Sequence, residues 1–147
     1  MTPRLLIHHA VAARFESAAA ACVGHVEEGG ILLGAYREGG MEVTGLTEAA
    51  PSDERMLTSF VRQDTRHQEV ATEAWTASGG TITMVGEWHT HPSGEPRPSA
   101  TDLGTWKAAL RRTRLPMAFV VVAPGMWWAY WGTRGFMFTR LPSAPRP

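Results

Sequence analysis

Cysteine is almost absent from this chain of 147 residues, because Cys22 is the only one. No disulfide can form within the chain, and a zinc knuckle built from cysteines is excluded. Cys22 follows the alanine run 18–21, a position that indicates a buried helix residue rather than a nucleophile.

Net charge and long apolar runs are missing as well. Fourteen Lys and Arg residues balance fourteen Asp and Glu residues, so no positive field draws the chain to nucleic acid or to an anionic membrane. The apolar run within residues 1–9 is too short for a signal peptide, and nothing approaches a membrane span. We therefore expect a cytoplasmic protein with no nucleic-acid or membrane partner. The sequence leaves the oligomeric state open.

The length of the chain, the absence of internal repeats and the even composition predict one domain. Periodicity and turn residues predict strands at 5–7, 30–36, 41–46, 81–86, 117–123, 126–131 and 136–138, and helices within 11–23, 62–78 and 102–114. This order is typical of an α/β domain, a mixed sheet flanked by helices, over residues 1–141. A disordered tail is expected at 142–147. The aromatic residues of 126–131 are expected in the core rather than on a partner surface.

A metal site is predicted between Gly86 and Trp106. His89 and His91 follow a run of β-branched residues, and in a strand residues two apart project from the same face. Ser99 opens a predicted helix whose first turn carries Asp102 back towards both imidazoles. Two nitrogens and one oxygen leave a fourth tetrahedral position open, as in catalytic rather than structural zinc sites.

Each part of this pattern also has a common explanation that involves no metal site. A His-x-His pair alone is weak evidence for a metal site, and Ser-x-x-Asp is also a common helix N-cap. A metallo-β-lactamase-like motif would need Asp and His where Ser93 and Gly94 stand. A barrel hydrolase would need roughly 250 residues. The complete spacing is more specific than its parts.

That spacing, His89-Thr90-His91, seven residues, Ser99, two residues and Asp102, resembles the motif of the JAMM (MPN-plus) metalloproteases. These enzymes cleave isopeptide and peptide bonds next to ubiquitin-like or other conjugated proteins. Residues 27–34 resemble the Glu-x-Gly-Gly-x-Leu-x-Gly element of the family, with Glu27 in the catalytic position. The resemblance implies an MPN sheet-and-helix sandwich with zinc (Zn2+) on His89, His91 and Asp102. It also implies Glu27 as the base and Ser99 as a hydrogen-bond donor to the oxyanion.

From spacing alone, several residues have two possible roles. Glu87 precedes His89 by two and shares its strand face, so it is a rival to Glu27 as the base. Ser99 has competing roles as helix cap and oxyanion donor. His67 lies on a polar helix and is expected to be solvated, without a catalytic role. Arg111, Arg112 and Arg114 are interpreted as cations that favour a helix C-terminus rather than as a binding patch.

The sequence Gly-Glu-Trp-His-Thr-His-Pro, with Phe60, His67 and Trp75, looks most like a bacterial branch of deconjugating proteases. That branch is found beside cyclic-oligonucleotide anti-phage systems (CBASS) and in integrative elements. The resemblance implies a zinc isopeptidase that removes the C-terminus of a cyclic-oligonucleotide synthase from target proteins, with residues 51–60 flanking the substrate groove.

Three other functions remain as alternatives. The chain could be a deubiquitinase-like protease acting on a ubiquitin-like protein, or a small-amide metallohydrolase. A catalytically silent scaffold is disfavoured, because every expected ligand is present.

Overall fold

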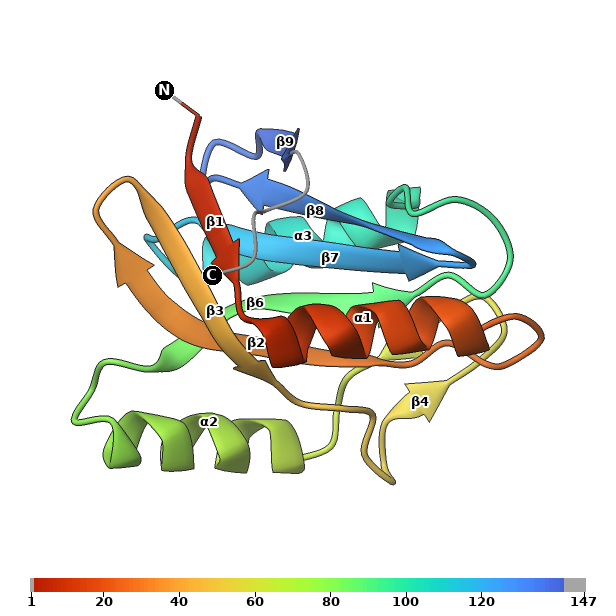
Figure 1. Ribbon diagram of the computed structural model, residues 1–147, viewed down its shortest axis with the longest axis horizontal. Helices are drawn as coiled ribbons and strands as arrows, with labels where there is room; N and C mark the ends of the chain where they lie inside the picture. The colour runs from red at the N-terminus through yellow and green to blue at the C-terminus, as the bar shows by residue number, and fades with distance from the viewer. Residues whose placement is uncertain (1, 142–147) are drawn as a thin grey trace.

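The computed structural model describes residues 2–141, so the tail expected to be disordered, 142–147, lies outside the described part of the chain. Figure 1 shows the arrangement of the elements. In chain order they are β1 (Arg4–Ile7), α1 (His9–Ala21), β2 (Gly29–Arg37), β3 (Gly40–Leu46), β4 (Glu54–Arg55), β5 (Phe60–Val61), α2 (Arg66–Ala77), β6 (Thr83–Thr90), α3 (Ala100–Arg111), β7 (Met117–Ala123), β8 (Met126–Gly132) and β9 (Phe138–Leu141).

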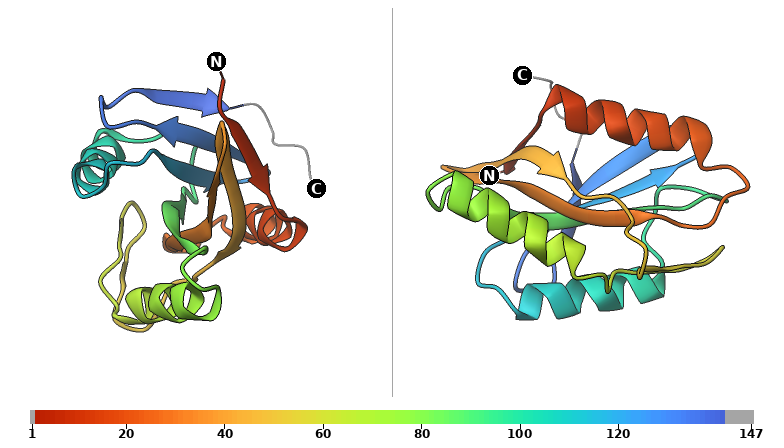
Figure 2. Two further views of the ribbon diagram at one scale, coloured as in Figure 1. Left: turned by 90° about the vertical axis from the view of Figure 1, so that its left-hand side faces the viewer. Right: turned by 90° about the horizontal axis from the view of Figure 1, so that it is seen from below.

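A seven-stranded sheet in the order β1-β3-β2-β6-β7-β8-β9 forms the centre of the molecule. The strands predicted at 30–36 and 41–46 form β2 and β3, which pair as an antiparallel hairpin, whereas β6 and β7 run parallel, so the sheet is mixed. Helix α1 covers one face, and α2 and α3 lie on the other (Figure 2). The α/β prediction of a mixed sheet flanked by helices is confirmed.

The alternation of side chains along β6 decides which face carries chemistry. Trp88 is buried on the α1 side, where its ring lies 5.8 Å from that of Phe15. Because neighbouring residues in a strand project from opposite faces, Glu87 and His89 turn towards the side of α2 and α3. The large aromatic core residue therefore fixes the orientation of the polar residues on either side of it.

A second apolar cluster packs under α3. Trp106 stacks on Phe119 at 4.5 Å between ring centroids and also contacts Tyr130. The expected core position of the β8 aromatics holds for Tyr130 and Trp131, which are buried, while Trp127 and Trp128 are half-buried. This cluster holds α3, the helix whose first turn carries Asp102, against the sheet.

The bounds of most predicted elements shift by one to four residues, and two of these shifts have a clear cause in the structure. The last strand was expected at 136–138 but begins at Phe138, because Phe136 has a φ of 59° and its N–H closes a turn on the Thr133 carbonyl. The helical segment 62–78 contributes only Arg66–Ala77, because the chain just before it is held outside the helix, where the N–H groups of Gln63 and Asp64 donate to the Asp53 carboxylate. Within residues 2–141, no helix is long and apolar enough to span a membrane.

Candidate metal centre

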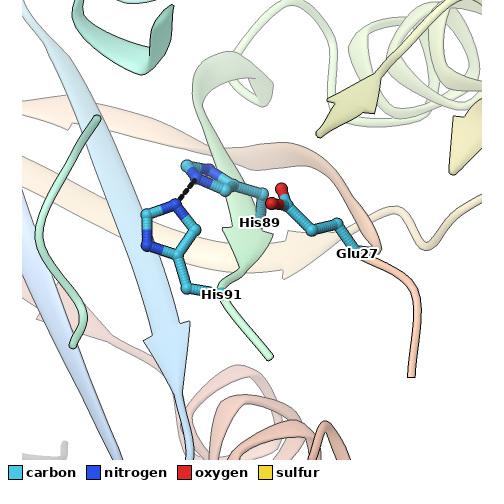
Figure 3. Close-up of side chains that lie close together, drawn as sticks. All are labelled: Glu27, His89 and His91. Carbon is cyan, nitrogen blue, oxygen red and sulfur yellow. Dashed lines mark hydrogen bonds between the residues drawn. The ribbon is translucent and has the colours of Figure 1, made fainter. Parts of the chain in front are cut away.

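The two histidines of the motif meet at the end of β6. The Nε2 atoms of His89 and His91 lie 3.0 Å apart and face one another (Figure 3). Asp102 Oδ2 is 3.2 Å from Nε2 of His89 and 3.0 Å from Nε2 of His91. The structure therefore brings the three predicted ligands, which are up to thirteen positions apart in the sequence, to one point.

Asp102 reaches this point because it belongs to the helix cap. The Asp102 N–H donates to Ser99 Oγ at 3.0 Å, and the Ser99 N–H donates to Asp102 Oδ2 at 2.7 Å, which is a reciprocal capping box. Burial alone would raise the pKa of Asp102, but its hydrogen bonds with His89 and His91 outweigh burial and hold that pKa well below its usual range.

His91 is oriented by the loop that follows it. Its Nδ1 lies 3.2 Å from the Glu95 carbonyl oxygen, which can only accept, so Nδ1 carries the hydrogen and Nε2 keeps a free lone pair. The loop is itself anchored where the Tyr130 hydroxyl donates to the Pro96 carbonyl at 2.8 Å. Burial opposes protonation of His91, but contacts with Asp102 and the Glu95 carbonyl raise its pKa overall.

Glu27 lies just before β2 and is buried beside the two histidines. One of its carboxylate oxygens is within 4.8 Å of ring nitrogens of both His89 and His91 (Figure 3). Burial raises the pKa of Glu27, while the charges of the histidines act in the opposite direction. The Glu27 backbone is clamped, because its N–H donates to the Met56 carbonyl at 2.7 Å and its carbonyl accepts from Arg55 Nε at 3.0 Å.

Two glycines allow Glu27 to approach this closely. Gly29 pairs with His89, and a Cβ atom built on Gly29 would lie 2.3 Å from the Trp88 carbonyl oxygen. A Cβ on Gly30 would lie 2.2 Å from the Thr47 carbonyl oxygen. Side chains at either position would push β2 away from its neighbours, so the glycine pair places the segment before it against the end of β6.

The three converging atoms suit a metal ion. Ligand atoms about 2.0–2.1 Å from a tetrahedral zinc ion stand roughly 3.3 Å apart, close to the separations of 3.0–3.2 Å found here. Two imidazole nitrogens and a carboxylate oxygen also match the ligands of first-row metals. Glu27 forms an overlapping trio with both histidines, but Asp102 lies closer to them. A metal cofactor therefore fits this site.

A groove of about 260 Å³ opens beside these residues and is here called the near groove. Its lining includes His89, Ser99 and Asp102 on one side, and residues 58–62 around β5 on another. Of the segment 51–60, which was expected to flank the substrate groove, Thr58, Ser59 and Phe60 line the near groove.

Glu87, the rival base, is engaged elsewhere. Its Oε1 accepts a hydrogen bond of 2.6 Å from Arg62 Nη2, and both side chains are largely shielded from solvent. Glu87 lines the near groove but does not belong to the cluster of Glu27, His89 and His91. The strand face that it shares with His89 therefore does not bring its carboxylate into that cluster.

The expectation that His67 is solvated is wrong. His67 is 1% exposed, with Nε2 at 2.6 Å from Asp53 Oδ2 and Nδ1 at 2.5 Å from Thr47 Oγ1. Thr47 Oγ1 accepts from the Ile31 N–H, so the hydrogen of the Thr47 hydroxyl is free to point to His67 Nδ1. A neutral His67 with its hydrogen on Nε2 then accepts from Thr47 and donates to Asp53. The residues around His67 on α2 are mostly polar and exposed, so the sequence pattern did not indicate that His67 is buried.

Asp53 was missed from the sequence alone, because no helix or strand is predicted in the polar segment 51–56 that contains it. Its carboxylate accepts from the N–H groups of Ala50, Gln63 and Asp64, each at 2.8 Å, besides its contact with His67. Burial would raise the pKa of Asp53, but these hydrogen bonds outweigh it and lower the pKa to about 2. Asp53 thereby closes the base of the β4–β5 hairpin. No local periodicity signals such a long-range role.

Proteins of three bacteria are similar in sequence to this chain. Each is named a CD-NTase/cGAS isopeptidase. The Pseudomonas aeruginosa protein (strain BWHPSA011 / Pa011) is 40% identical over 98 residues, 65% of this chain and 62% of that protein. The Escherichia coli protein (strain TW11681) is 34% identical over 65% of this chain and 61% of that protein. The Vibrio cholerae protein (serotype O1) is 33% identical over 69% and 65%. The chain thus matches less than two thirds of each relative's length.

Solved structures share the fold. A protein of Desulfitobacterium hafniense superimposes with a TM-score of 0.68 at 16% identity, over 97% of this chain and 94% of that one. A protein of Salinibacter ruber gives a TM-score of 0.54 at 21% identity, over 96% and 90%. Residues 9–134 match the family model described as prokaryotic homologs of the JAB domain. With the His89, His91 and Asp102 geometry in place, the chain belongs to this family of prokaryotic JAB-domain proteins.

Proposed function

We propose that this chain is a zinc-dependent isopeptidase of the cytoplasm that removes a conjugated protein from its targets. The observation that carries the proposal is the meeting of His89, His91 and Asp102 within 3.2 Å of one another, with the Glu27 carboxylate beside them. The open near groove next to these residues gives an extended chain access to the site.

His89, His91 and Asp102 would hold the zinc ion. A bound zinc ion polarises a scissile carbonyl and increases the acidity of water. The capping box and the Glu95 carbonyl fix two of the three ligands before any metal arrives. These hydrogen bonds support a role of the side chains as metal ligands, because they limit the rearrangement that metal binding requires.

Glu27 serves as the general base and then as the acid. Its carboxylate takes a proton from the attacking water and returns it to the nitrogen of the leaving amine. A raised pKa suits both steps, because a more basic carboxylate takes up the proton of the water more readily and keeps it until it is passed to the leaving amine. The clamp by Arg55 and Met56 holds the backbone of this residue in place.

Ser99 donates a hydrogen bond to the developing oxyanion. A hydroxyl offers one donor and two acceptor positions, and capping uses only an acceptor position, because Asp102 N–H donates to Oγ. The O–H hydrogen remains available to the near groove, which Ser99 lines. The two roles that compete on sequence grounds are therefore compatible in this geometry.

The proposed substrate is a target protein conjugated to the C-terminus of a CD-NTase, the cyclic-oligonucleotide synthase that the bacterial resemblance implies. The names of the three relatives support this choice. The β4–β5 pair is two strands wide, so one edge of β5 has no strand partner among the described residues, and β5 lines the near groove. An extended C-terminal tail can pair with such an edge and deliver its carbonyl to the site.

A cleavage assay tests the proposal. The C-terminal tail of a CD-NTase is joined through an amide to a reporter protein, and ubiquitin-like conjugates and a small acyl amide are assayed in parallel. Release after the CD-NTase tail, lost in His89→Ala, is expected. Release only from ubiquitin-like conjugates would indicate a deubiquitinase-like protease, and release only from the small amide would indicate a small-amide hydrolase.

A further inference from the structure

A second hollow of about 300 Å³ continues the near groove and is here called the far hollow. The two share Arg62, Glu87, Ala109 and Arg112, so the Arg62–Glu87 ion pair lies where they join. Tyr36, Met84 and Met117 contribute further walls to the far hollow. None of the residues proposed for catalysis or metal binding lines it.

The position of Glu27 indicates which part of a substrate reaches the far hollow. Glu27 precedes the first residue of β2, whereas Tyr36 lies near the other end of that strand. The leaving amine must be near Glu27, because Glu27 supplies its proton. The acyl side of the substrate, its tail, therefore extends in the opposite direction, along β6 towards Met84 and the far hollow.

The distance along β6 sets the length of this tail. Met84 precedes His89 by five positions on one strand, and a strand rises about 3.3 Å per residue, which gives roughly 16 Å. An extended peptide covers that distance in about five residues. The far hollow therefore faces a side chain four to six residues before the scissile bond.

The charges of the far hollow favour an acid. Arg62 is paired with Glu87, but Arg112 is exposed, and no acid pairs with it in the part of the chain that the structure describes. Two arginines and one glutamate give the far hollow a net positive charge beside the apolar side chains of Met84 and Met117. The Tyr36 hydroxyl already donates to the Pro116 carbonyl at 2.7 Å, so Tyr36 offers mainly its ring.

We propose that the far hollow is a specificity subsite that binds an acidic side chain of the substrate tail, four to six residues before the scissile bond, through Arg112. This inference rests on the proposed isopeptidase function. Arg112 acts there as a specificity-determining residue, in addition to its place at the C-terminal end of α3. A tail with a lysine at the same position meets like charge and binds less well.

A charge-swap experiment tests the subsite. The zinc-loaded protein is given peptides of eight residues that end in a fluorogenic amide and carry Asp, Ala or Lys at the fourth, fifth or sixth residue before the bond. For wild type, we expect kcat/KM to be roughly tenfold higher with Asp than with Lys at one of these positions, because Arg112 attracts the Asp side chain and repels the Lys side chain. The preference should shrink as salt is added.

The variant Arg112→Glu should reverse the order, so that the Lys peptide becomes the better substrate. Arg114→Glu is the matched control, because it makes the same charge change near the same helix end but lines neither hollow. Both variants place a negative charge near the C-terminal end of α3, where the helix dipole disfavours it, and Arg112→Gln removes the positive charge without adding a negative one. Wild-type order in Arg114→Glu and loss of preference in Arg112→Gln are expected.

The possible failures are distinguishable. Cleavage of all peptides at equal rates, or an unchanged Asp preference in Arg112→Glu, would overturn the subsite while leaving the peptidase activity established. If metal-loaded wild type cleaves none of the peptides and no CD-NTase conjugate, the proposed function itself is wrong, and the subsite fails with it.

Discussion

His67 Nε2 and Asp53 Oδ2 lie 2.6 Å apart, and both side chains are almost entirely buried. Asp53 closes the base of the β4–β5 hairpin, and His67 continues to Thr47, whose carbonyl accepts from Trp88 Nε1 at 2.8 Å. One buried hydrogen-bonded chain thus ties the wall of the near groove to β6, the strand that carries His89.

Replacing Asp53 should destabilise the protein in a pH-dependent manner. The folded pKa of about 2 lies below the ordinary value of 3.8, so ionised Asp53 contributes stability that is fully present above about pH 4. That contribution is lost as the pH falls towards about 2. The shift corresponds to about 2 kcal/mol. Asp53→Asn should therefore lower the free energy of unfolding at pH 7 by about that amount.

Urea unfolding of wild type and Asp53→Asn between pH 2 and pH 7 measures this effect. The difference between the two proteins should be constant from pH 7 to about pH 4 and should narrow below it. Glu73→Gln, an exposed carboxyl on α2, is the control and should change little. A difference that stays the same at pH 2 would show that the carboxylate charge is not what matters.

The purified protein should carry about one zinc ion per chain, since three ligands converge and one position stays open. His89→Ala and Asp102→Ala should lose the metal, whereas His25→Ala, an exposed histidine outside the cluster, should keep it. Elemental analysis of protein purified without chelators gives the count. Wild type that contains no zinc and takes up none when it is added would refute the metal assignment.

Glu27→Gln should retain the metal but lose activity roughly a hundredfold or more, because removing a positioned base has an effect of that size. Glu87→Gln should lose far less, since Glu87 pairs with Arg62 outside the cluster. Steady-state kinetics on a cleavable conjugate, with the zinc content measured for each variant, compares the two. If Glu87→Gln is the more damaged of two folded, metal-loaded variants, the base is Glu87.

Ser99→Ala should show two separable losses. Removal of the cap lowers the free energy of unfolding by about 1 kcal/mol, and removal of the oxyanion donor lowers kcat roughly a hundredfold. Ser99→Thr keeps both the acceptor and the donor and should recover most of each. Thermal unfolding and kcat, measured on the same preparations, distinguish the roles. A stability loss with unchanged kcat would leave Ser99 as a helix cap alone.

The local geometry of the metal ligands could be predicted from the sequence alone. His89 and His91 share a face because strand side chains alternate with a period of two, and Ser99 and Asp102 meet because a helix start must satisfy its free N–H groups. Both rules depend on covalent geometry within a few residues. The β2–β3 hairpin was predictable for the same reason, since Gly39 and Gly40 mark its turn.

The partners of the remaining residues depend on how distant segments of the chain pack together. Glu27 reaches His89, 62 positions away, through a strand register that needs Gly29 and Gly30 against their neighbours. Glu87 has the spacing of a base but is bound by Arg62 from another segment. The sequence around His67 is typical of a surface helix, but in the fold His67 is buried between Asp53 and Thr47. Sequence periodicity reports which residues share a face, whereas burial and pairing depend on which distant segments pack against that face.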